Sequence, residues 1–162
     1  NDLASEMYSV TENLTQKNEI PAYEISNYSK KDRNCYHNLN YWEAGDWLGI
    51  GPGAVSRFFY NNKRTQVDVR KDPNGWLNSM KIHSNGIKSV NSETIEEFWR
   101  EKLLMGLRLV KGVNIKPIKN ILNMNKVYEL VDSNFLNLNN DIMKTTFNGR
   151  LRLNSILIEI IK

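Results

Sequence analysis

The chain has 162 residues, of which 40% are hydrophobic and 25% are charged, and its formal net charge is +4. This length suits one ordinary domain or two small ones, and the composition is typical of globular proteins. No run of eighteen apolar residues occurs, so we expect no transmembrane helix. The single cysteine excludes an internal disulfide and fits a reducing compartment, for which we expect the cytoplasm. The mild positive charge permits an anionic ligand without indicating a nucleic acid.

The N-terminal part combines one clear helix with weaker signals. Apolar residues recur at spacings of three and four over residues 2–18, which predicts an amphipathic helix. The start has neither an initiator methionine nor a signal-peptide pattern, so we expect a piece of a longer protein. We expect a short strand at residues 22–28 and an irregular polar segment at residues 29–46. The apolar stripe of the helix consists of Leu3, Met7, Val10 and Leu14.

Glycines and asparagines punctuate the next segment. The sequence DWLGIG predicts a strand that enters a GPG turn at residues 51–53. AVSRFFY and TQVDVR predict the two strands of a hairpin, because asparagine tolerates the positive φ that its turn needs. We expect the basic residues of this hairpin, Arg64 among them, to be solvated. KDPNG predicts a turn at residues 71–75, and a linker is expected within residues 76–90.

From Asn91 onward the sequence is mainly helical. Asn91 or Ser92 is expected to cap a helix that carries glutamates near its start and closes at Lys111–Gly112. Further helices are expected at residues 115–122 and 125–132, followed by a small hairpin around NND and a last helix. This order of three helices, a hairpin and a helix is typical of a winged-helix-like domain.

The aromatic-rich sequence CYHNLNYW contains the residues that could carry chemistry. A neutral imidazole and a thiolate can both ligate haem iron, so His37 and Cys35 are candidates. On composition alone, an ordinary loop histidine and an inert cysteine are the preferred alternatives. One cysteine cannot hold an iron–sulfur cluster, because such clusters need several thiolates.

Two other patterns carry less functional information. GIGPGAVS is not a phosphate-binding loop, because no GK[ST] follows it and no helical pattern begins behind it. Its glycines either let the backbone approach a ligand closely or fix a tight turn. The candidate recognition helix of the winged-helix-like part, KVYELVDS, is net negative, which disfavours DNA binding. We therefore expect no nucleic-acid partner.

The segment YEISNYSKKDRNCYHNLNYWEAGDWLGIGPGAVSR resembles the oxygen-independent coproporphyrinogen III oxidase-like family. This is the branch of radical S-adenosylmethionine (SAM) proteins that contains HemN and HemW, and HNLNYW is similar to the HNxxYW motif of its HemW-type members. EKLLMGLRLVKGV and TFNGRLRLNSILIEII are similar to later family segments, so the resemblance covers nearly the whole chain. It implies an α+β fold. Residues 1–88 would form the C-terminal part of a radical-SAM partial (β/α) barrel, and residues 89–162 a winged-helix-like, mostly helical C-terminal domain.

The resemblance also implies cofactors. In this family a CxxxCxxC motif binds a [4Fe–4S] cluster, and SAM occupies the open site of that cluster. The motif is absent from this sequence, so we expect the chain alone to be inactive in cleaving SAM. In HemN-type relatives the small residues after the glycine turn lie beside SAM. The corresponding candidates here are Gly53, Ala54, Val55 and Ser56.

HemW-type members are regarded as haem chaperones, and the HNxxYW motif is implicated in their handling of haem. By this resemblance His37 is the candidate axial ligand, with Asn38, Tyr41 and Trp42 as the other candidate haem contacts. The expected function is that of the C-terminal portion of a HemW-like chaperone, which binds haem or porphyrin and delivers it to haem-receiving proteins. The alternative is a coproporphyrinogen III oxidase of porphyrin biosynthesis, which oxidatively decarboxylates two propionates by means of a SAM-derived radical. Peripheral contact with a membrane surface is left open.

Overall fold

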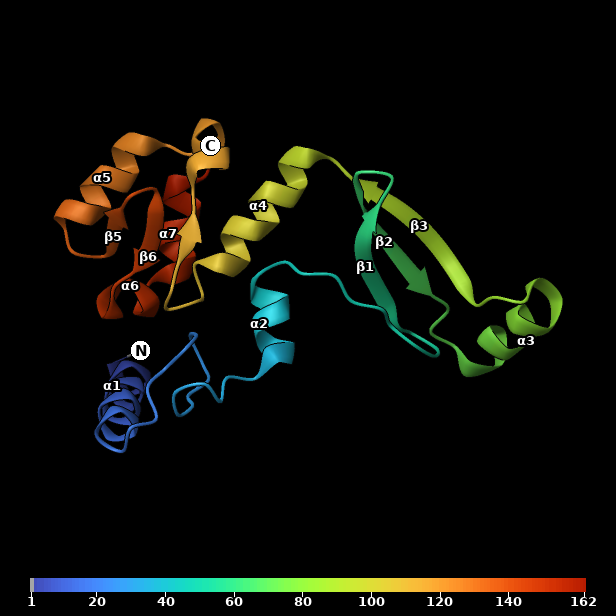
Figure 1. The fold of residues 1–162 in the computed structure, drawn as a ribbon, viewed down its shortest axis with the longest axis horizontal. Coiled ribbons are helices and arrows are strands. Elements are labelled where there is room, and N and C mark those ends of the chain that lie inside the picture. Colours follow the sequence, from blue (N-terminus) through green and yellow to red (C-terminus); the bar gives the residue numbers. More distant parts are fainter. Residues whose placement is uncertain (1) are drawn as a thin grey trace. The chain divides into compact units, whose positions relative to one another are not determined.

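The computed structural model describes residues 2–162, which form two compact units (Figure 1). The first unit is discontinuous and combines residues 1–43 with residues 100–162. The second unit is the insertion between them, residues 44–99. Both units mix helices with antiparallel strands, which confirms the predicted α+β class. The predicted domain boundary between residues 88 and 89 falls inside a strand. The division into domains 1–88 and 89–162 stays a prediction.

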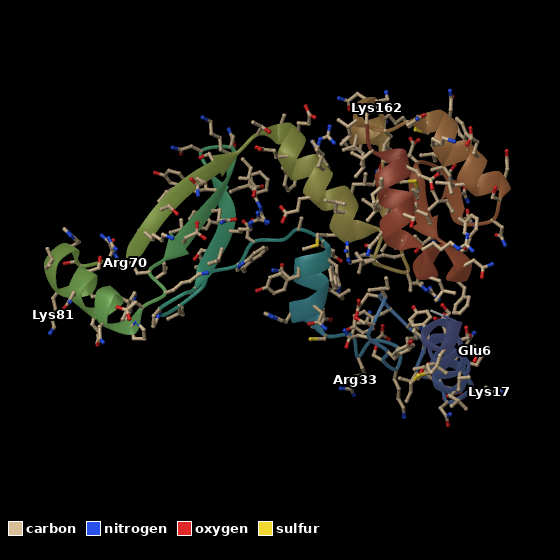
Figure 2. All side chains as sticks on the ribbon, turned by 180° about the vertical axis from the view of Figure 1, so that it is seen from behind. Glu6, Lys17, Arg33, Arg70, Lys81 and Lys162 are labelled. Carbon is tan, nitrogen blue, oxygen red and sulfur yellow. The ribbon has the colours of Figure 1, made fainter. Side chains whose placement is uncertain are left out.

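The first unit begins with the predicted helix, α1 (Asp2–Lys17). Its apolar stripe is present, but this stripe faces solvent, because each of its four side chains is more than half exposed. Glu6 and Lys17, labelled in Figure 2, are exposed as well. The opposite side of the helix makes the tertiary contacts. Tyr8 stacks on Phe147, and Arg150 pairs with Glu12.

The C-terminal part of the first unit holds the main core and the expected winged-helix order. A three-stranded sheet of order β4-β6-β5 packs with the helices around residues such as Leu103, Ile118, Met143 and Ile160, which are almost fully buried. The predicted last helix is split in two, because Arg152 interrupts it. Its apolar residues Leu153, Ile156, Leu157 and Ile160 are buried. The elements are β4 (Val113–Asn114), the 3-10 helix η1 (Lys116–Ile121), α5 (Met124–Asp132), β5 (Leu136–Asn139), β6 (Ile142–Thr145), α6 (Phe147–Leu151) and α7 (Leu153–Ile160).

The second unit is built on a three-stranded antiparallel sheet. Its strands β1 (Val55–Tyr60) and β2 (Lys63–Val69) form the predicted hairpin, and Asn61 and Asn62 both have positive φ, as a two-residue type I′ turn requires. β3 (Ile87–Glu93) adds to β2 within the segment where a linker was expected. The expected linker is wrong, because β3 and a helix occupy most of that segment. The turn expected at KDPNG is wrong too, because Asp72 caps this helix, α3 (Pro73–His83).

The predicted strand at DWLGIG is also absent, since Trp47 forms only an isolated bridge with Arg57.

A buried cation organises the second unit. Arg64 was expected to be solvated, but it is only 2% exposed. Its guanidinium lies 2.5 Å from a carboxylate oxygen of Asp46 and donates to the carbonyl of Gly45 at 2.7 Å. The opposite charge and the hydrogen bonds compensate for the loss of water around the guanidinium. Three aromatic rings lie within cation–π distance of it: Trp47, Phe59 and Phe98.

The helix α4 (Ile95–Gly106) connects the two units in sequence. Its start differs from the prediction, because the expected caps Asn91 and Ser92 belong to β3 and Thr94 takes the capping role. Glu97 accepts hydrogen bonds from the backbone N–H of Thr94 at 2.7 Å and from its hydroxyl at 2.9 Å. In return the Thr94 hydroxyl accepts from the backbone N–H of Glu97, which completes a capping box.

The turn at Gly112 is fixed by two independent constraints. Gly112 has a φ of +77°, a region that residues with a Cβ rarely adopt. A Cβ built there would also overlap the carbonyl oxygen of Met143 and lie 2.6 Å from the Lys144 side chain. Lys111 and Gly112 line two cavities, of about 260 Å³ and 610 Å³.

No helix in the described part of the chain combines the length and apolarity that crossing a bilayer requires.

Gly112→Ala is expected to destabilise the protein by more than about 2 kcal/mol, because it adds steric overlap to backbone strain. Gly51 provides the control, since its φ is +93° but no atom lies within 4 Å of an added Cβ. Gly51→Ala should therefore cost about 1 kcal/mol, from strain alone. Chemical denaturation of the two variants measures the difference. Equal destabilisation would show that the contact with Met143 has no role.

Hydrogen bonds from Thr94, first from its backbone N–H and then from its hydroxyl, lower the pKa of Glu97 below 4.5. A lowered folded-state pKa stabilises the fold fully above the unfolded value, and this contribution disappears as the pH falls through the folded value. Thr94→Ala removes the hydroxyl and keeps the N–H, so the pKa of Glu97 should rise part of the way toward 4.5. An NMR titration measures it, and an unchanged pKa in the variant would contradict the capping box.

Candidate functional site

The motif HNLNYW forms a short helix, α2 (Tyr36–Trp42), in a segment for which the sequence predicted irregular structure. Cys35 is its N-cap residue with extended backbone angles, and its thiol is exposed and makes no capping hydrogen bond. Residues four apart lie on one side of a helix, so the motif presents two side-chain pairs on adjacent faces. One pair is His37 with Tyr41, and the other is Asn38 with Trp42.

The first pair places an imidazole at the protein surface. His37 is exposed, and its ring meets the ring of Tyr41 edge to face, with centroids 4.9 Å apart. This contact restricts the imidazole without covering it. The phenol ring of Tyr41 is half-buried, so it anchors the histidine to the body of the unit. His37 is therefore accessible to a ligand that approaches α2 from solvent.

The second pair faces the protein. The amide of Asn38 lies 3.5 Å from the hydroxyl of Tyr23, a distance at the limit of a hydrogen bond. The indole of Trp42 has the guanidinium of Arg108 5.5 Å from its ring centroid. Its Nε1–H is buried and has no hydrogen-bond partner among the described residues. Trp42 also lines the 260 Å³ cavity beside the Lys111–Gly112 turn.

The support under α2 is a turn held by a buried carboxylate. Residues 22–28 were predicted to be a strand, but they form a compact turn closed by a bridge between Ala22 and Tyr28. Glu24 is fully buried and accepts hydrogen bonds from the backbone N–H of Ser26 at 3.2 Å and from the side-chain amide of Asn27. These bonds satisfy a group that would otherwise be strongly unfavourable in the interior.

The turn around Glu24 connects three parts of the first unit. The hydroxyl of Tyr8 in α1 donates to the carbonyl of Ile25 at 3.0 Å. The backbone N–H of Val110, just before Gly112, donates to the carbonyl of Tyr23 at 3.1 Å. Tyr23 in turn reaches Asn38 of α2. Burial raises the pKa of Tyr8 above its ordinary value of 10.0, so its hydroxyl remains a donor into the alkaline range.

The candidate SAM residues lie in the second unit, so the two predicted groups of site residues belong to different units. The N–H of Gly53 donates to the carbonyl of Arg70 at 2.8 Å, and that of Ala54 to Gly51 at 3.3 Å. Ser56 is buried, and its hydroxyl accepts from the N–H of Gly49 at 3.0 Å. The loop is therefore fixed by its own hydrogen bonds, and these two N–H groups are already engaged. Its role beside SAM stays a prediction.

The residues present do not fit an iron–sulfur cluster. The sequence contains one cysteine, Cys35, whereas a [4Fe–4S] cluster needs several thiolates. Among the described residues, no group of three or more histidine, cysteine, aspartate or glutamate side chains could hold a metal ion. No step that depends on the cluster can therefore be derived from this chain.

Sequence comparison relates the chain to longer proteins. The mitochondrial radical S-adenosyl methionine domain-containing protein 1 of Dictyostelium discoideum is 34% identical, over 98% of this chain and 42% of that protein. The haem chaperone HemW of Escherichia coli is 28% identical, over 83% of this chain and 36% of that protein. No family model matches the chain.

Structural comparison gives a consistent result. HemN of Escherichia coli, described as a coproporphyrinogen III oxidase and radical SAM enzyme, matches with a TM-score of 0.67 over 93% of this chain and 39% of its own. The chain belongs to the HemN and HemW family of radical SAM proteins, in its HemW-like branch. The identity to HemN is 12%, so that likeness shows the fold alone. This HemW-like chain spans about two fifths of the length of the relatives named here.

The motif on α2 could be identified from the sequence, but the cations around Trp42 could not. Lys102, Arg108 and Lys111 lie sixty or more residues further along the chain and come to Trp42 only through the fold. No spacing rule connects them to the motif. The one indication in the sequence is their shared place in the family segment EKLLMGLRLVKGV.

Glu24→Gln is expected to lower the free energy of unfolding by about 1–3 kcal/mol, because an amide NH₂ would replace one acceptor oxygen in the buried turn. The amide protons of α2 should exchange faster, since the turn supports Tyr23 and Asn38. Denaturation and hydrogen exchange of the full-length protein measure both effects. Glu6→Gln on the exposed side of α1 is the control. Unchanged exchange in α2 would show that the turn does not support the motif.

Proposed function

We propose that this chain is the C-terminal portion of a haem chaperone, in which α2 presents His37 as an axial ligand of haem. The observation that carries the proposal is the exposed imidazole of His37 within an HNxxYW motif that the fold holds as a helix. A neutral imidazole is a common haem ligand, and the adjacent aromatic rings offer apolar contact to a porphyrin. The relative from Escherichia coli is itself named a haem chaperone.

The alternative function, oxidation of coproporphyrinogen III, has less support. It rests on the fold of HemN at 12% identity, whereas the sequence relatives named above are a HemW chaperone and a mitochondrial radical SAM protein. In the full-length protein, SAM bound to a [4Fe–4S] cluster would supply radical chemistry. The ligands of that cluster would have to come from outside this chain, because it has a single cysteine.

We further propose that residues 53–56 form part of the SAM site, through their small size rather than through the N–H groups of Gly53 and Ala54. Haem-receiving proteins remain the proposed partners. The predicted cytoplasmic location remains a prediction, because one relative is mitochondrial and another is bacterial.

His37→Ala is expected to remove or shift the Soret band of haem bound to the full-length protein and to weaken binding by about tenfold or more. The chain has two histidines, so His83 provides a matched control. His83 is exposed on α3 in the second unit, and His83→Ala should leave the spectrum unchanged. A titration of both variants with haem, followed by absorption, makes the comparison. A wild-type spectrum in His37→Ala would rule out His37 as the ligand.

A further inference from the structure

The cavity beside Trp42 combines an apolar floor with a charged rim, and it lies wholly within the first unit. Its volume is about 260 Å³. Leu109 and Val113 are buried apolar residues in its lining, and Lys102 and Lys111 are its basic residues. A cavity of this kind suits a ligand that has an alkyl chain ending in an anion.

The electrostatic balance around this cavity favours an anion. Lys102 and Lys111 of the lining supply two positive charges, and the guanidinium of Arg108 lies over the Trp42 ring. One carboxylate of the lining opposes them, that of Glu43, which forms an ion pair with Lys111. Both members of that pair are substantially exposed, with side chains 44% and 62% accessible. An exposed pair contributes little stability, so an incoming carboxylate can replace Glu43 on Lys111 at small cost.

The indole of Trp42 supplies a second, independent indication of a ligand. Its Nε1–H is a hydrogen-bond donor and can accept nothing. It is buried without a partner among the described residues, a state that is unfavourable by about 1–3 kcal/mol. Trp42 is also part of the cavity lining. Because this nitrogen is buried, a carboxylate oxygen in the cavity accepts from its N–H only once the side chains that cover it move aside.

We infer that this cavity binds a propionate carboxylate of the porphyrin, through Lys102, Lys111 and the Nε1–H of Trp42. The inference rests on the proposed haem function and adds the position of the porphyrin edge to it. His37 and Trp42 are five residues apart on α2, which corresponds to about 7.5 Å along the helix axis. The two side chains are also about 140° apart around the helix axis, so a haem whose iron binds His37 must extend a propionate around α2 to reach the cavity.

The test compares haem with its dimethyl ester, in which both propionate carboxylates are methylated. Binding to the full-length protein is titrated by absorption in the wild type and in the double variant Lys102→Gln/Lys111→Gln. The double variant should bind haem roughly tenfold more weakly and should bind the ester as the wild type does. The Soret position should not change, because the iron ligand is untouched. Equal affinity of the wild type and the double variant for haem would overturn the inference.

A second variant changes binding in the opposite direction. Glu43→Gln removes the carboxylate that competes for Lys111, so it should tighten the binding of haem about three- to fivefold and leave the ester unaffected. Since Glu43 is half exposed, this change should not impair folding. Weaker or unchanged binding of haem by Glu43→Gln would contradict the proposed competition.

Lys116→Gln serves as the matched control for charge, because Lys116 is exposed in the same unit and is not part of the cavity lining. An equal loss of affinity in this variant would indicate non-specific attraction and overturn the inference. The outcomes also separate the two proposals. If the affinity for haem depends on His37 but not on the two lysines, only the role of His37 as haem ligand is supported. If the affinity depends on the lysines but not on His37, only the carboxylate cavity is supported. No binding of either porphyrin by the wild type would overturn both.

Discussion

The buried carboxylate of Glu24 is the constraint on which the first unit depends. It satisfies the donors of a turn that has no regular secondary structure of its own. Through that turn, α1, α2 and the segment before Gly112 are tied to one another by hydrogen bonds. A seven-residue helix such as α2 is too short to be stable by itself. The geometry of the HNxxYW motif is therefore a tertiary property, maintained by a residue outside the motif.

Local signals were sufficient for the elements whose stability is local. The apolar periodicities of α1 and α7, and the asparagines of the β1–β2 turn, predicted those elements correctly. α3 was missed because Asp72 and Pro73 favour a helix start as well as a turn, and only tertiary context distinguishes them. β3 is too polar to suggest a strand, and its pairing with β2 defines it. The prediction that the basic residues of the hairpin are solvated was wrong for Arg64, because the aromatic rings of Trp47 and Phe98 come from distant positions in the sequence.

The candidate site also has a part that could be predicted from the sequence and a part that could not. The motif residues could be found from the sequence by resemblance, and the fold then separates their roles. His37 is exposed and packs against the half-buried Tyr41, whereas Asn38 and Trp42 connect α2 to the body of the unit. The cavity beside Trp42 could not be found in this way, because its lysines have no periodic relation to the motif. Periodicity describes one element at a time, whereas a cavity is formed by several elements.

The turn at Gly112 has a consequence for the way charge is distributed over the first unit. Only a glycine fits this turn, because an added Cβ would overlap the carbonyl oxygen of Met143, whereas the four-carbon stem of the adjacent Lys111 is adaptable. Lys111 belongs to the lining of two cavities, one beside Trp42 and one along the β5–β6 hairpin. A single ammonium group thus serves both. Movement of this group toward one cavity carries it away from the other, so an anion bound in one cavity would lower the positive charge that Lys111 offers to the other.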